Sequence, residues 1–161
     1  MLALGIGSLL VIGLMIATYG RFGVYATIAL VLNVLMLLGI MAALNTTLTL
    51  PGIAGFVLTI GAAVDANVLI NERIREEVKR GRRPIDAVQV GYKEASRAIF
   101  DANITNVIAA ALMFWFGSGP IKGFAVVLTI GIVTSVFTAV TVSRMFVAGW
   151  LKRARPAQLV I

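Results

Sequence analysis

The sequence predicts an all-α fold, a polytopic helical membrane bundle. Of its 161 residues, 60% are hydrophobic, and the mean hydropathy is +0.99. A soluble globular domain has an apolar share of only about 45–50%. The apolar residues gather in five long runs, each compatible with the ~20 residues that a helix needs to cross a bilayer. We therefore expect one domain of five transmembrane helices.

The five helices are expected to follow the apolar runs and to end where glycine, proline or charged residues interrupt them. They cover about residues 2–19, 24–44, 53–71, 102–116 and 124–147, and a tail follows at 150–161. The fourth is the shortest and needs its polar start, residues 101–106, to reach across the membrane. A membrane interior tolerates such polar groups when they face protein.

The long connection, residues 72–100, is expected to be helical in two parts. The third helix continues through Lys79 and ends at Gly81, a residue suited to a left-handed cap. Pro84 fits the first turn of a cytoplasmic amphipathic helix. The apolar stripe of that helix recurs at three- and four-residue steps and consists of Ile85, Val88, Tyr92, Ala95 and Ile99. It lies either along the membrane surface or against the ends of the bundle.

Lysine and arginine set the expected orientation. Thirteen of the fourteen lie in the first connection, in the third connection, or between Arg144 and the end of the tail, while Lys122 lies on the other side. By the positive-inside rule the thirteen face the cytoplasm, and five spans then place the N-terminus on the outer side of the membrane and the C-terminus in the cytoplasm. We therefore interpret the chain as the C-terminal membrane part of a larger protein. This placement favours a lipid environment and no nucleic-acid partner.

Asp65 is the strongest candidate for a functional residue. It is the only charged residue between Arg21 and Glu72. A carboxylate in a membrane span is costly and usually marks an ion or proton path. Helical spacing places Gly61 and Ala62 near the same face, where small residues let a neighbouring helix approach. The alternative is a structural hydrogen bond to a neighbouring helix.

Other polar residues are candidates for an intramembrane polar network. Asn67 lies roughly opposite Asp65 and either joins this network or hydrogen-bonds between helices. The tripeptide Asp-Ala-Asn recurs at residues 101–103, where Asp101 is expected to cap the fourth helix. The remaining candidates are Asn103, Asn106, Thr134 and Thr138. The two threonines belong to a stripe that either lines a water-filled wall or bonds to its own backbone.

Several kinds of chemistry are excluded. The sequence has no cysteine and no histidine, so disulfides, thiol catalysis and histidine-based metal sites are ruled out. It also has no phosphate loop and no nucleophile with an adjacent base. We therefore expect no enzyme activity, cofactor or metal. Any transport would draw on a partner or on an ion gradient, and a proton crossing ~100 mV releases ~2.3 kcal/mol.

Three segments carry a resemblance to a known family. They are LTLPGIAGFVLTIGAAVDANVLINERIREEV, GYKEASRAIFDANITNVIAA and GSGPIKGFAVVLTIGIVTSVFTAV. Together they resemble the SecD branch of the SecD/SecF family of protein-export membrane proteins, which is related to the RND transporter superfamily. The resemblance covers essentially the whole chain. It implies half of an RND-like transmembrane unit in the bacterial inner membrane.

The resemblance also implies a function. Members of the family pair with SecF, associate with the SecYEG channel and other accessory Sec proteins, and use the proton-motive force to assist export. Exported polypeptides would meet a periplasmic region that lies outside this sequence. The family's proton-carrying aspartate corresponds to Asp65, with H⁺ as the coupling ion. One alternative is a non-conducting scaffold for SecF and the channel, and another is an RND-type exporter of drugs or lipids, which the long motifs disfavour.

Overall fold

The computed structural model describes residues 2–45, 49–159 and 161. Its elements are α1 (Leu2–Tyr19), α2 (Arg21–Ala43), α3 (Leu50–Lys79), α4 (Pro84–Phe116), α5 (Gly119–Phe137), the π-helical turn η1 (Thr138–Val142) and α6 (Ser143–Ala154). The last three follow one another without a break, so the described residues form five helical rods and no strand. The all-α prediction is confirmed. Residues 46–48, in the predicted connection between the second and third helices, lie outside the described residues.

Four of these rods are long and apolar enough to cross a membrane. Within the described part of the chain they are α2, α3, α4 and the continuous run Gly119–Ala154. The remaining rod, α1, is apolar but has only 18 residues, which corresponds to about 27 Å of helix. The membrane crossing of α1 therefore stays a prediction. The third and fifth predicted spans begin earlier than expected, at Leu50 and Gly119, and the fifth rod continues to Ala154.

α4 is a single helix of 33 residues, where the sequence predicted an amphipathic helix followed by a separate span at 102–116. Residues 97–103 contain no proline or glycine, so the charges of Arg97 and Asp101 change the composition without ending the helix. The predicted apolar stripe, apart from Ile85, is buried against other helices of this chain. Packing against the bundle is therefore correct, and a position along the membrane surface is wrong.

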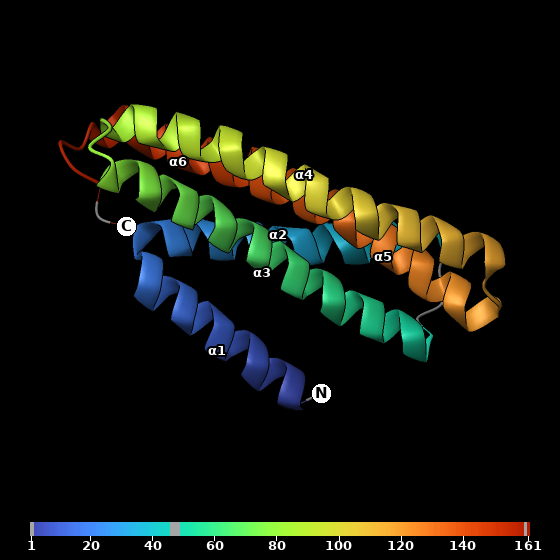
Figure 1. The fold of residues 1–161 in the computed structure, drawn as a ribbon. Helices are drawn as coiled ribbons and strands as arrows, with labels where there is room; N and C mark the ends of the chain where they lie inside the picture. Colours follow the sequence, from blue (N-terminus) through green and yellow to red (C-terminus); the bar gives the residue numbers. More distant parts are fainter. Residues whose placement is uncertain (1, 46–48, 160) are drawn as a thin grey trace.

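The centre of the bundle consists of α3, α4 and α5, while α2 contacts α5 and α6. Figure 1 shows α4 running alongside α5 and α6, whereas α1 diverges from the other helices toward the N-terminus. The turn between α1 and α2 depends on two glycines. Gly20 has a φ of +54°, in the region that favours glycine. A Cβ on Gly23 would overlap the backbone of Met15.

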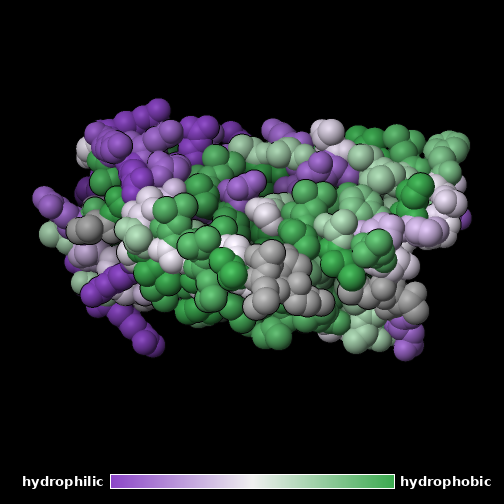
Figure 2. All heavy atoms as spheres, turned by 90° about the horizontal axis from the view of Figure 1, so that it is seen from below, coloured by the Kyte–Doolittle hydropathy of each residue, from purple (hydrophilic) through white to green (hydrophobic). Residues whose placement is uncertain are grey.

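The α1–α2 turn, the α3–α4 turn and the C-terminal tail lie together, and we call this part of the molecule the basic end (Figure 1). Thirteen of the fourteen basic residues belong to these turns, to the tail or to the helical segments that lead into them, whereas Lys122 belongs to the first turn of α5 at the opposite end. Figure 2 shows hydrophilic residues gathered at the basic end and hydrophobic residues over much of the remaining face. The largest apolar core also lies near this end and includes Ile70, Ile74, Tyr92, Val147 and Leu159.

Candidate functional site

The two faces of α3 differ in what covers them. Asp65 and Asn67 are two residues apart and therefore point in roughly opposite directions from a helix. Asp65 is exposed, whereas Asn67 retains only 2% of its exposure. We call the exposed side the open face of α3, which consists of Ala54, Val57, Leu58, Gly61 and Asp65. Gly61 shares this face with Asp65, as the helical spacing predicted, while Ala62 is half-buried beside it.

Asp65 makes no hydrogen bond or ion pair with any described residue. One turn earlier, a Cβ added to Gly61 would meet nothing within 4 Å. A charged carboxylate in an apolar environment needs a partner or water. The described part of the chain supplies no such partner for Asp65.

Asn67 joins α3 to α6. Its Nδ2 donates to the carbonyl oxygen of Ala63 at 2.9 Å, and its Oδ1 accepts a hydrogen bond from Ser143 Oγ at 2.9 Å. Ser143 follows directly after the π-helical turn η1, and both side chains are buried. Such turns change the register of the helix that follows and are frequent at functional sites. These contacts fit the role of a hydrogen bond between helices.

Thr134 and Thr138 are buried but bond within their own helix. Thr134 Oγ1 donates to the carbonyl oxygens of Ile130 and Gly131, at 3.0 and 3.1 Å. Thr138 Oγ1 donates to the carbonyl oxygens of Thr134 and Ser135, again at 3.0 and 3.1 Å. The stripe therefore satisfies its own backbone, the second of the two alternatives, and its hydroxyls do not reach Asp65.

The candidates on α4 do not form a network with Asp65. Asp101 lies inside α4, so its predicted role as a helix cap is wrong, because the helix begins seventeen residues earlier at Pro84. Its exposed side chain lines a groove between α3 and α4 together with Arg73 and Arg97. Asn103 Nδ2 donates to its own helix, at the carbonyl oxygen of Ile99 2.8 Å away. Asn106 is exposed.

Two buried amides carry polar atoms without a partner. Asn33 on α2 is fully buried, and neither its Nδ2 nor its Oδ1 has a hydrogen-bond partner among the described residues. The Nδ2 of Asn71, on the buried face of α3, is likewise unpaired. The sequence analysis missed Asn33. A single amide in the middle of the otherwise apolar second span was the available indication, because polar groups at that depth are costly.

The C-terminal end of α1 contacts α3 near the basic end. Tyr19 Oη donates to Glu72 Oε1 at 2.8 Å, and Arg75 Nη1 donates to the same oxygen at 2.6 Å. Arg75 Nη2 also donates to the carbonyl oxygen of Thr18 at 2.9 Å. The end of α1 is therefore attached to α3 about two turns beyond Asp65. Within the described ranges, no three acidic side chains lie close enough together to hold a metal ion.

Comparisons with known proteins identify the family of this chain. Residues 1–153 match the family described as protein export membrane protein SecD/SecF, C-terminal. The chain is 52% identical over 160 residues to the protein translocase subunit SecD of Acetobacter pasteurianus, covering 99% of this chain and 31% of that protein. It is 47% identical over 161 residues to the protein of the same name from Rhodobacter capsulatus, covering 100% of this chain and 29% of that one.

A solved structure supports the same relationship. The crystal structure of SecDF from Thermus thermophilus, described as a translocon-associated membrane protein, matches with a TM-score of 0.91 at 40% identity. The match covers 98% of this chain and 22% of that one. The chain thus spans less than a third of the length of each of these relatives.

Proposed function

The chain belongs to the SecD/SecF C-terminal family of protein-export membrane proteins, and we propose that it is the membrane domain of a SecD subunit. In this proposal it acts with SecF to convert the proton-motive force into assistance for protein export across the bacterial inner membrane. The basic end faces the cytoplasm, as the positive-inside rule requires. The chain is a transport subunit, and it contributes no catalytic group of its own.

Asp65 is the proton-carrying site in this proposal. The observation that carries it is an unpaired carboxylate in the middle of an apolar helix, on a face that no other helix of the described chain covers. Protonation removes the charge and favours tight packing of this face, whereas ionisation favours a hydrated arrangement. An ion gradient can alternate between two such states because it changes the population of each.

SecF supplies the partner surface in this proposal. The open face of α3 has a small residue, Gly61, one turn from Asp65, which permits close approach of another helix. The half of α4 that is farther from the basic end adds large exposed apolar side chains, among them Ile104, Ile108 and Leu112. SecYEG, accessory Sec membrane proteins and exported polypeptides are further partners that we expect of the complete protein.

The substitution Asp65→Asn tests this function in the full-length protein co-purified with SecF and reconstituted into vesicles. We expect proton uptake into the vesicles, followed with an internal pH-sensitive dye, to fall to the level of vesicles without protein. Gradient-dependent export should fall with it, while SecF still co-purifies. Glu76→Gln is the matched control, because Glu76 is an exposed carboxylate about three turns beyond Asp65 on the same helix and lies outside the open face. Undiminished proton uptake in Asp65→Asn would reject the proposal.

A structural scaffold is the second candidate. It is favoured by the same exposed apolar side chains on α3 and α4, which suit a static interface as well as a moving one. In that case Asp65 would hold SecF in place by a hydrogen bond across the interface. Loss of SecF from the purified Asp65→Asn complex, with normal proton uptake in the complex that remains, would support the scaffold.

A further inference from the structure

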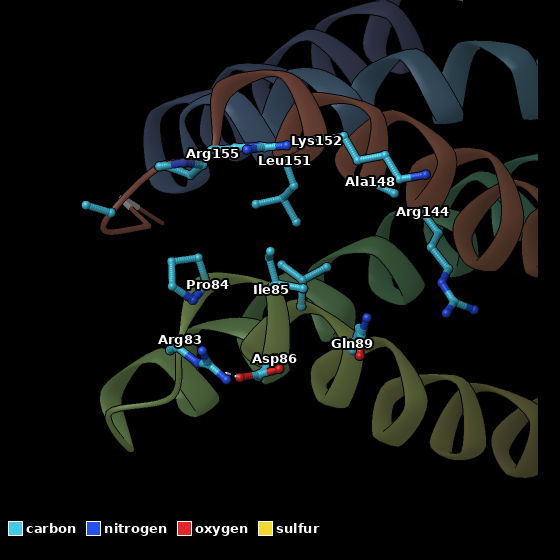
Figure 3. A pocket seen from close by; sticks show the side chains of 13 residues that line it. Arg83, Pro84, Ile85, Asp86, Gln89, Arg144, Ala148, Leu151, Lys152 and Arg155 are labelled. Atoms are coloured by element: carbon cyan, nitrogen blue, oxygen red, sulfur yellow. Dashed lines mark hydrogen bonds and ion pairs between the residues drawn. The ribbon is translucent and has the colours of Figure 1, made fainter.

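A pocket of about 1070 Å³ opens at the basic end of the molecule. One wall is the first turn of α4, and the other is α6 with the start of the C-terminal tail. Figure 3 shows Ile85 from α4 and Leu151 from α6 extending into the space between the two elements. The pocket is distinct from the open face of α3, and none of the candidate proton-path residues lines it.

The pocket has more positive charge than the protein itself neutralises. Four basic residues line it, Arg83, Arg144, Lys152 and Arg155, against a single carboxylate, that of Asp86. Arg83 Nε pairs with Asp86 Oδ2 at 3.2 Å. The other three cations form no ion pair or hydrogen bond with a described residue. A concave surface with unpaired charge of one sign attracts a ligand of the opposite sign.

Between these cations the lining is apolar. Ile85 is the one exposed member of the predicted apolar stripe of α4, with 53% of its surface accessible. Val88 and Leu151, which are 5% exposed, complete the apolar lining beside it. An occupant with a hydrocarbon portion would remove the Ile85 side chain from water, which is favourable in proportion to the area covered.

The tail is folded so as to build one side of this pocket. Arg155 ends α6 in the left-handed conformation, with φ 39° and ψ 55°, which is uncommon for a residue other than glycine. The chain then turns back, so that Pro156 and Ala157 line the pocket while Leu159 packs into the apolar core at 8% exposure. The pocket is therefore a formed part of the fold, with a wall anchored in the core.

We propose that this pocket binds an anionic phospholipid from the membrane leaflet that borders the basic end. Arg144, Lys152 and Arg155 hold the phosphate, and an acyl chain lies over Ile85. Trp150, next to Leu151, stacks its ring under the Arg21 guanidinium at 5.8 Å, and tryptophan is enriched at the level of lipid headgroups. Basic pockets between transmembrane helices on this side of a membrane suit anionic headgroups. Neither a free anion nor a purely apolar ligand would use both parts of the lining.

The test measures lipid binding to the full-length protein, co-purified with SecF in mild detergent, by native mass spectrometry. Phosphatidylglycerol and phosphatidylcholine are titrated separately, with inorganic phosphate as a competitor. The pocket variant carries Arg144→Gln, Lys152→Gln and Arg155→Gln. The control variant carries Lys79→Gln, Lys93→Gln and Arg153→Gln, which remove the same charge from exposed residues outside the pocket. A fourth protein carries Ile85→Gln, an exposed substitution that tests the apolar lining without burying a polar group.

We expect phosphatidylglycerol to bind more tightly than phosphatidylcholine, and the pocket variant to weaken its binding by roughly tenfold or more. The control variant should bind as the unmodified protein does, and Ile85→Gln should weaken binding of the lipid without strengthening competition by phosphate. Equal losses in the two triple variants would overturn the proposal, because they indicate general attraction to the basic end. Equal binding of the two lipids, or binding of inorganic phosphate with no lipid retained, would overturn it as well. Cross-links from Lys152 to an acidic polypeptide, in place of lipid, would assign the pocket to a protein partner instead.

Discussion

The two faces of α3 differ in how their polar side chains are hydrogen-bonded. On the buried face, both hydrogen bonds of Asn67 lie within the chain, since its Nδ2 donates to the carbonyl oxygen of Ala63 and its Oδ1 accepts from Ser143 Oγ. On the open face, Asp65 has no partner among the described residues, and Gly61, one turn earlier on the same face, has free space beside it. Asn67 on the buried face is therefore satisfied within the chain, although Asn71 Nδ2 on the same face is unpaired, whereas Asp65 on the open face has no partner among the described residues.

This difference separates residues that hold the bundle together from residues that work with a partner. A substitution on the buried face should act on the stability of the chain itself. A substitution on the open face should leave that stability unchanged and act on assembly or proton transport. The two classes can therefore be distinguished by measuring unfolding and SecF association on the same protein.

The largest expected contrast is between two glycines. A Cβ at Gly131 of α5 would overlap the side chain of Thr59 on α3. Since overpacking costs about 1–3 kcal/mol, Gly131→Ala should lower the free energy of unfolding by that amount. Gly61→Ala meets no obstacle and should leave it unchanged or raise it, because alanine favours a helix over glycine by up to ~1 kcal/mol. Denaturant-induced unfolding of the detergent-solubilised protein measures both.

The same pair of positions tests the open face directly. Gly61→Leu should leave unfolding of the isolated chain close to normal and reduce the amount of SecF that co-purifies, because the larger side chain holds the partner helix away. Equal destabilisation by Gly61→Ala and Gly131→Ala would contradict the division into two faces. So would a Gly61→Leu protein that binds SecF normally.

Replacing Asn33 should change the free energy of unfolding by a smaller amount than Gly131→Ala does, and in the opposite direction. Its buried amide has no partner among the described residues, and an unsatisfied buried polar group costs about 1–3 kcal/mol. Asn33→Leu should therefore raise the free energy of unfolding by roughly 1 kcal/mol, whereas the neighbouring control Leu37→Asn, at another fully buried α2 position, should lower it. A less stable Asn33→Leu protein would show that water or a partner satisfies this amide in the membrane.

Helical periodicity explains why part of this arrangement was predictable. Residues 65 and 67 must face apart on any α-helix, so the sequence placed Gly61 beside Asp65 and set Asn67 opposite them. The helix end was equally predictable, since Gly81 has a φ of +82° just after α3 ends at Lys79. These features depend on local geometry alone.

Features that depend on neighbouring helices were not predictable from one sequence. Arg97 and Asp101 suggested a boundary, yet α4 continues through them because nothing at those positions interrupts its hydrogen bonds. The contact between Ser143 and Asn67 needs the relative rotation of α3 and α6, with the π-helical turn η1 before Ser143. The unpaired atoms of Asn33 follow only from knowing which side chains surround it.

A double-mutant cycle tests the contact between Asn67 and Ser143 on the buried face. Asn67→Ala and Ser143→Ala each remove one partner of a single hydrogen bond, so the two effects should be less than additive. In membrane proteins such couplings average ~0.6 kcal/mol and reach ~1.7 kcal/mol, and we expect a value in this range. The control cycle pairs Asn67→Ala with Ser96→Ala, since among the described residues Ser96 bonds only to its own helix, at the carbonyl oxygen of Tyr92. Additivity in the Asn67–Ser143 cycle would mean that this bond does not connect the two helices energetically.

The smallest effect is expected from the ion pairs at the basic end of α3. Arg73 and Glu76 are three residues apart, and their side chains are 44% and 48% exposed. Water and salt screen such a pair, so Arg73→Gln should change the free energy of unfolding by no more than ~0.5 kcal/mol. Glu77 lies on the buried side, with its side chain 7% exposed and paired with both Arg80 and Arg82, and a buried carboxylate that loses one of its two cations is less well compensated. Arg82→Gln should therefore lower the free energy of unfolding more than Arg73→Gln does. Added salt should reduce the effect of Arg73→Gln at a lower concentration than it reduces the effect of Arg82→Gln. Equal effects of the two substitutions at every salt concentration would contradict this prediction. They would show that the buried and exposed faces of α3 do not differ in this way at its basic end.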